Sequence, residues 1–197
     1  MRVRVKKESF FPGLNFKTVA VSHGGELGKG KRKEQRPFDP KQALHVVLRS
    51  SLARGERSML HPNHCDHIHS LTLRLAKRWG VRLYRYANVG NHIHLLLKAP
   101  SRAVWQRFLR ELAGGIPIIV TGARKGDALP KNESGRGFWD HVAFTRIVHF
   151  GRDFQNMGRY LIKNIFESAG VPMKKLLAQG LRICTISKDG LVLGVPS

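Results

Sequence analysis

The stretch RLYRYANVGNHIHLLLK, from Arg82 to Lys98, decides the fold of this chain. Two runs of aromatic, branched and aliphatic residues flank the pair Gly90-Asn91, a combination that is typical of a turn between two strands. The stretch therefore predicts a β-hairpin. Side chains alternate between the two faces of a strand, so His92 and His94 would share one face. The other face would carry the apolar side chains of the same strand, namely Ile93, Leu95 and Leu97.

Outward from the hairpin, the spacing of apolar residues predicts further strands and helices. Before it we expect a strand at 44–48 and a helix that ends near Gly80. After it we expect a helix that starts near residue 101 and is interrupted at 114–115, a segment at 116–120 that fits either a strand or a helix, a strand within 138–150 and a helix at 152–168.

This order of elements is the ferredoxin-like, split βαβ arrangement of the α+β class. It predicts an antiparallel sheet with helices on one face and a further helix after the last core strand. The opposite face of the sheet would stay free for a ligand.

The charge of the chain points to a polyanion as partner. Its 197 residues include 35 Lys or Arg against 13 Asp or Glu, a net charge of +22, and such an excess favours nucleic acid. The run KGKRKEQR at 29–36 is typical of a solvated interaction tail. We interpret residues 1–40 as a basic arm, 41–171 as the folded domain and 172–197 as a C-terminal extension that could form a β-hairpin.

Other classes of protein are disfavoured. No run of about 18 apolar residues could form a membrane span, and the start of the chain lacks an apolar signal core. Two cysteines, Cys65 and Cys184, cannot form a disulfide-rich scaffold or a four-cysteine zinc site. We expect a cytoplasmic protein without a membrane partner, associated with the nucleoid in a prokaryote.

A second histidine-rich segment, HPNHCDHIH from His61 to His69, could be either structural or metal-binding. In a helix, His67 and His69 would point about 200° apart, so they could not hold one ion together. We favour a helix start with capping and phosphate-contact roles. A structural zinc site that includes His61, His64 and Cys65 is the alternative.

Two features could carry chemistry. Neighbouring imidazoles on a strand, as at His92 and His94, can hold a divalent cation, although strand histidines are also common on ordinary surfaces. Tyr160 and Asn164 are four residues apart, so they share one helix face at the border of its apolar stripe. A half-packed tyrosine is also common. Together, however, the features match phosphoryl transfer: a cation on the phosphate and a hydroxyl as nucleophile.

Two segments resemble one family, the single-tyrosine HUH transposases, which include the REP-associated tyrosine transposases. YANVGNHIHLLLK, at 86–98, is similar to its strand–turn–strand, with Val89-Gly90 where the family usually has Met-Pro. YLIKNIFESAGV, at 160–171, is similar to its tyrosine helix, with Ile165 where the family has Pro. The resemblance extends over about 44–171.

The resemblance implies a role for each candidate residue. His92, His94 and Asn164 would bind Mg²⁺ or Mn²⁺, and Tyr160 would be the nucleophile on the helix added after the last core strand. The product would be a 5′-phosphotyrosine with a free 3′-hydroxyl on single-stranded hairpin DNA. The family contains both homodimers and monomers, so a homodimer is one arrangement that the resemblance allows.

Basic side chains would bind the DNA, six of them beside the active surface and four in the arm. They are Arg82, Arg85, Lys98, Arg102, Arg107 and Arg110, with Lys29, Lys31, Arg32 and Lys33. The alternative function is a non-catalytic nucleic-acid-binding protein on the same fold. Such a protein would display stacking aromatic residues on its central strands, where this chain has His92 and His94, and this difference favours an enzyme.

Overall fold

The computed structural model describes residues 22–25, 35–124, 127–128, 130–132, 135 and 137–168. These residues form a five-stranded sheet with the strand order β1-β5-β2-β4-β3, and every pairing is antiparallel. The elements are β1 (Ser22–His23), β2 (Ala43–Arg49), a short 3-10 helix (Gly55–Arg57), α1 (Pro62–Arg78), β3 (Arg82–Asn88), β4 (His92–Lys98), α2 (Arg102–Thr121), β5 (Phe144–Val148) and α3 (Arg152–Ser168). The predicted α+β, ferredoxin-like fold class is confirmed.

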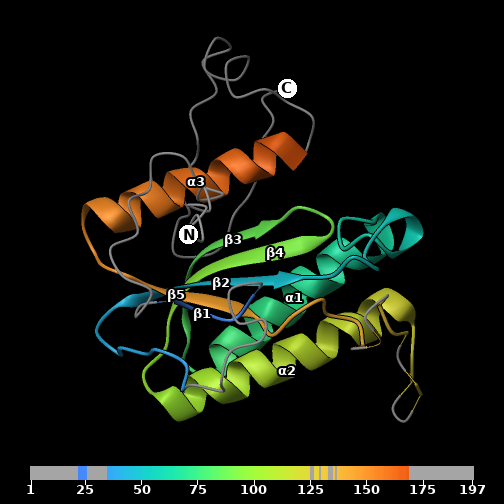
Figure 1. Cartoon of the computed structure of the whole chain (residues 1–197), viewed down its shortest axis with the longest axis horizontal. Coiled ribbons are helices and arrows are strands. Elements are labelled where there is room, and N and C mark those ends of the chain that lie inside the picture. The colour runs from blue at the N-terminus through green and yellow to red at the C-terminus, as the bar shows by residue number, and fades with distance from the viewer. Residues whose placement is uncertain are drawn as a thin grey trace, which may run out of the picture.

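Helices α1 and α2 cover one face of the sheet, and α3 crosses the other face (Figure 1). The larger core lies under α1 and α2. It contains Ile93 and Leu95 of β4, Ile68 of α1, and Trp105 and Phe108 of α2, all of which are buried. Full burial of one such side chain stabilises the fold by roughly 1.5–3 kcal/mol. The alternation predicted for β4 is therefore correct, and its apolar face lies against these two helices.

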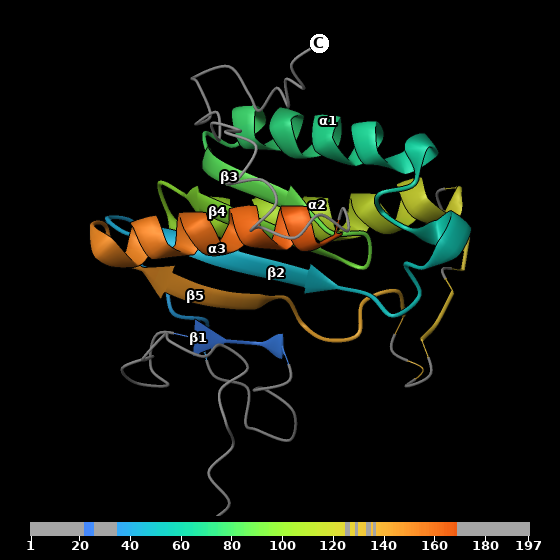
Figure 2. The same ribbon diagram turned by 90° about the horizontal axis from the view of Figure 1, so that it is seen from above.

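The second face is partly covered, although we predicted that it would stay free for a ligand. Figure 2 shows α3 lying over the sheet on this side. Met157 and Leu161 of α3 are buried against Leu96 of β4 in a second, smaller core. The apolar stripe of α3 explains the difference, because an amphipathic helix that follows the last strand has to bury that stripe.

Helix α2 continues through the residues where we predicted an interruption. A Cβ at Gly115 would lie 2.7 Å from Leu71 of α1, so the glycine allows the two helices to approach closely. Pro117 cannot donate a hydrogen bond to the carbonyl of Ala113, and the indole N–H of Trp139 donates to this carbonyl instead, at 2.7 Å. Packing thus stabilises a helix that local sequence disfavours.

The described parts of segment 1–40 lie against the domain. Strand β1 pairs with β5. The Nη1 atom of Arg36 donates to the carbonyl of Ala143 and to Oγ1 of Thr145, at 2.5 and 3.0 Å. Four cations predicted to bind DNA lie outside the described residues, as does the whole extension 172–197; these cations are Lys29, Lys31, Arg32 and Lys33. In the part of the chain that is described, no helix is both long and apolar enough to cross a membrane.

Candidate active site

Three imidazoles gather on the sheet face below α3. In the register of β2 and β4, Val47 pairs with His94 and Arg49 with His92. His45, two residues before Val47, therefore lies diagonally across from His94. The rings of His45 and His94 are parallel within 3°, with centroids 5.4 Å apart, and Nε2 of His45 lies 3.1 Å from Nδ1 of His94. The centroids of His92 and His94 are 4.7 Å apart.

All three imidazoles are held in their neutral form. Burial lowers the pKa of His45 to about 3, and the charge of Arg146 adds to this effect. Burial lowers the pKa of His92 to about 4, with a further contribution from Arg49. His94 is only 3% exposed, and burial together with the two neighbouring histidines lowers its pKa well below 6.5. Neutral imidazole is the form that binds metal ions.

The hydrogen bonds around the two β4 imidazoles determine which of their ring nitrogens could bind a metal ion. Nδ1 of His92 lies 2.6 Å from Oδ1 of Asn91, an oxygen that can only accept, so Nδ1 carries the proton and Nε2 carries the lone pair. Nε2 of His94 is buried and has no hydrogen-bond partner among the described residues. If Nδ1 of His94 donates to His45, then Nε2 of His94 also carries a lone pair. Histidine ligands commonly donate their second ring nitrogen in this way.

This donor set fits a divalent cation that keeps several positions open. Among the described residues, no group of three or more His, Cys, Asp or Glu side chains could hold a metal ion. The two imidazoles would therefore need oxygen ligands from an amide, a phosphate or water. Such mixed nitrogen and oxygen coordination suits a cation that also has to bind a substrate phosphate.

Tyr160 of α3 lies against the histidines. Its ring stands edge-on to His94 and to His45, with centroid distances of 5.8 and 6.3 Å. It is half-buried at the border of the α3 stripe, as the helical spacing predicted. Asn164 lies one turn further along and donates from Nδ2 to the carbonyl of Tyr160, at 2.8 Å. In the described chain, no hydrogen bond joins Asn164 to His92 or His94.

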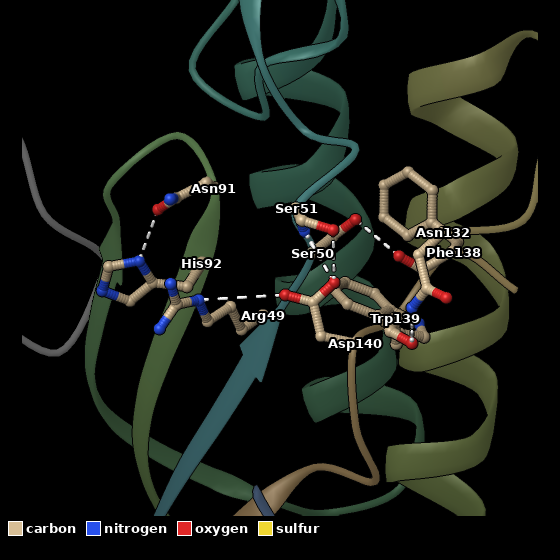
Figure 3. Close-up of polar contacts among 9 residues, drawn as sticks. All are labelled: Arg49, Ser50, Ser51, Asn91, His92, Asn132, Phe138, Trp139 and Asp140. Carbon is tan, nitrogen blue, oxygen red and sulfur yellow. Dashed lines mark hydrogen bonds and ion pairs between the residues drawn. The ribbon is translucent and has the colours of Figure 1, made fainter. Parts of the chain in front are cut away.

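Contacts of Asp140 with Arg49 and Ser51 at the end of β2, which we call the clamp, hold the Arg49 guanidinium beside His92 (Figure 3). Asp140 accepts hydrogen bonds from the backbone N–H and the hydroxyl of Ser51, at 2.8 and 2.7 Å. The Asp140 N–H donates to the carbonyl of Arg49, and Nε of Arg49 lies 3.8 Å from Oδ2 of Asp140. The Arg49 side chain is 57% exposed. The clamp thus leaves a largely solvent-exposed guanidinium next to His92.

His45 and Arg49 were not among the site residues predicted from the sequence. Their signal is the alternation in ALHVVLR, at 43–49, where Leu44, Val46 and Leu48 face the larger core and the residues between them face α3. The pairing of β2 with β4 was needed to place these side chains beside His92 and His94.

The structure separates the predicted DNA-binding cations into two groups. Three of them lie on the two strands of the hairpin. Lys98 of β4 is on the same face of the strand as His92 and His94. Arg82 and Arg85 of β3 pair with Lys98 and Leu96 of that face. Our placement of Arg102, Arg107 and Arg110 beside the active surface was wrong, because they lie on α2, across the sheet from His92. The apolar stripe of α2 packs on the face of the sheet opposite the histidines. The cations of α2 therefore lie on the other side of the sheet from the site.

The histidine-rich segment 61–69 forms the start of α1, as predicted. His61 is the N-cap, and its Nδ1 accepts from the N–H of Asn63 at 3.3 Å. Nδ1 of His64 lies 3.0 Å from the carbonyl of Ser58. In this segment, as in the rest of the described chain, no three His, Cys, Asp or Glu side chains are placed so that they could hold a metal ion.

The comparisons with known proteins add a shared fold. No family model and no curated protein matches the chain. A solved structure of a REP-associated tyrosine transposase bound to a REP hairpin is similar, with a TM-score of 0.50 and 11% sequence identity, over 81% of this chain and 93% of that one. A putative transposase from Deinococcus radiodurans R1 has a TM-score of 0.40 and 17% identity, over 68% of this chain and 98% of that one. The first likeness shows that this chain has a transposase-like fold.

Proposed function

We propose that this protein is a metal-dependent endonuclease and transposase that nicks and rejoins single-stranded hairpin DNA. The observation that carries the proposal is the contact between the ring of Tyr160 and a cluster of neutral imidazoles on the sheet face opposite the main core. The transposase-like fold and the net charge of +22 support it.

In the proposed reaction, the Tyr160 hydroxyl oxygen attacks the phosphorus at the nick site and loses its proton to solvent. The bond from phosphorus to the 3′ oxygen breaks, and that oxygen leaves as a free 3′-hydroxyl after it takes up a proton. The 5′ phosphate stays on Tyr160 as a phosphodiester. Rejoining is the reverse: a 3′-hydroxyl attacks the phosphotyrosine and releases the Tyr160 hydroxyl.

His92 and His94 would bind Mg²⁺ or Mn²⁺ through Nε2, and Asn164 would offer Oδ1, since its Nδ2 is used within α3. The cation, when bound, supplies positive charge to the phosphate. His45 would hold His94 in the tautomer that leaves Nε2 free. The exposed guanidinium of Arg49 would lie beside the same phosphate.

The DNA would follow the basic side chains on the face of the histidines, Arg82, Arg85 and Lys98, with the arm cations as further contacts. The Tyr160 and His94 rings that meet belong to the same chain. This contact supports an active site built within one copy, whether or not the protein forms a homodimer.

The alternative, a non-catalytic nucleic-acid-binding protein, is favoured by one observation. His94 is almost fully buried, and its Nδ1 is occupied by His45. A site of this kind could have lost access for a phosphate while the surface charge was retained.

Nicking of a hairpin oligonucleotide distinguishes the two functions. The wild-type protein should nick it with Mn²⁺ or Mg²⁺ and not with EDTA. His92→Ala should abolish nicking and leave hairpin binding intact, whereas the control His67→Ala, an exposed residue of α1, should nick normally. Binding without nicking by the wild-type protein would favour the alternative, and normal nicking by His92→Ala would refute the metal site.

A further inference from the structure

A cluster of aromatic rings lies at the end of the sheet farthest from His92. Tyr84 of β3 stands edge-on to Phe154 of α3, with centroids 5.0 Å apart, and to Phe150 at 5.9 Å. The rings of Phe150 and Phe154 are 5.2 Å apart. Lys98, at this end of β4, is six residues from His92 and four from His94, so it lies about 20 and 13 Å along the strand from these two histidines.

Two cations lie over these rings. The guanidinium of Arg82 is 5.8 Å from the ring centre of Tyr84, and Nζ of Lys98 is 5.7 Å from that of Phe150. Arg82 and Lys98 are direct partners in the β3–β4 register. Within the described residues, neither forms a salt bridge. No acidic side chain of the described residues therefore neutralises the charges of Arg82 and Lys98 through an ion pair.

The cluster has a packed base and an exposed top. Tyr84 and Phe154 pack against the smaller core under α3. Phe150 precedes α3, its N–H donates to Oε1 of Gln42 at 3.2 Å, and the residue is 45% exposed. Packing at the start of a helix explains the partly buried rings of Tyr84 and Phe154, but it does not explain an exposed phenyl group beside two cations.

We propose that Phe150, supported by Tyr84 and Phe154, stacks an unpaired base of single-stranded DNA, while Lys98 and Arg82 bind the adjacent phosphates. Exposed aromatic rings combined with a positively charged track are the usual means of binding single strands. The inference rests on the proposed function only for its choice of DNA as partner. It adds a binding site at a distance from the nick, where the strand would be held before and after cleavage.

The test measures the affinity for a fluorescent oligodeoxythymidylate by anisotropy, in EDTA so that no cleavage occurs. Phe150→Leu keeps an apolar side chain and removes the ring, and it should weaken binding by about 5- to 150-fold, the range measured for one base stacked on one ring. Phe150→Trp should bind as tightly as wild type or more tightly. The control, Leu73→Ala, removes an exposed apolar side chain of α1 and should have no effect.

A second probe separates stacking from other contributions of Phe150. The wild-type protein should bind an oligonucleotide of the same length with abasic sites as weakly as Phe150→Leu binds the complete one. The wild-type protein and Phe150→Leu should have the same affinity for the abasic oligonucleotide. Lys98→Gln and Arg82→Gln should each lower the slope of log K against log salt by about 0.7.

Wild-type affinity in a folded Phe150→Leu variant would overturn the proposal. Two other results would also overturn it. One is that Phe150→Leu loses as much affinity for the abasic oligonucleotide as for the complete one. The other is that the wild-type protein binds polyglutamate, a polyanion without bases, more tightly than DNA. Since the assay contains no metal and measures no nicking, this outcome is independent of whether the wild-type protein cleaves DNA.

Discussion

The two faces of β4 have opposite chemistry although they alternate along a single strand. Ile93, Leu95 and Leu97 are fully buried under α1 and α2, in a core made of apolar side chains. On the face under α3, His94 is also buried, but within the part of the chain that the structure describes its Nε2 has no hydrogen-bond partner. A buried polar atom of this kind costs about 1–3 kcal/mol. The first face stabilises the fold, and the second keeps a group that is unfavourable for stability and suited to a bound cation.

Substitutions at two adjacent positions of β4 should show the largest difference in stability between the two faces. Ile93→Ala should destabilise the protein by about 2–5 kcal/mol, because it leaves a cavity in a close-packed core. His94→Ala should cost less, because it also removes a buried nitrogen that has no hydrogen-bond partner in the described ranges of the chain. Urea denaturation of both variants measures the difference. A larger loss for His94→Ala than for Ile93→Ala would contradict this division of roles.

Lowering the pH should destabilise the folded protein through the buried histidines of the face under α3. The folded pKa of His45 is about 3, below its ordinary value of about 6.5. Between these pH values the unfolded chain binds a proton that the folded chain does not bind, so stability is complete above pH 6.5 and falls as the pH falls. His45 alone should lower stability by about 2 kcal/mol at pH 5, and His92 and His94 act in the same direction.

Denaturation curves between pH 7.5 and pH 5 measure this effect, and His45→Gln should make stability less dependent on pH. An unchanged pH dependence in His45→Gln would mean that His45 is not held neutral by burial.

A smaller effect should appear on the other face, where Trp139 donates to the carbonyl that Pro117 leaves free in α2. Trp139→Phe keeps a ring and removes the donor, and it should cost about 1 kcal/mol or somewhat more. In a Pro117→Ala background the helix supplies its own donor, so the same substitution should cost less. A double-mutant cycle measures the coupling. No coupling would refute the role of the indole N–H, and nicking by these variants should be unchanged.

Much of the fold could be predicted from local patterns. The bounds of β4 and α3 coincide with the predicted 92–98 and 152–168, because both segments have strong and regular spacing. Local patterns could not show that α2 passes through Gly114-Gly115 and Pro117, because contacts from Leu71 and Trp139 make this possible.

The candidate site was only partly predictable for the same reason. The spacing indicated that His92 and His94 share a strand face and that Tyr160 and Asn164 share a helix face. Which face of the sheet α3 covers, and that His45 lies beside His94, depend on layer packing and strand register, which the sequence of one element does not contain. The misplaced cations of α2 have the same cause, since the side of the sheet on which a helix packs is a tertiary property.

The covalent attachment of DNA to Tyr160 tests the central claim most directly. Hairpin oligonucleotides labelled separately on each side of the nick would be incubated with protein and Mn²⁺ and separated on a denaturing gel, with Tyr160→Phe as the matched variant that keeps the ring and its packing. The account predicts that the fragment on the 3′ side of the nick migrates with the wild-type protein, that the 5′-side fragment runs free, and that Tyr160→Phe binds the hairpin without cutting it. Cleavage by Tyr160→Phe, or cleavage by the wild-type protein without an adduct, would contradict it.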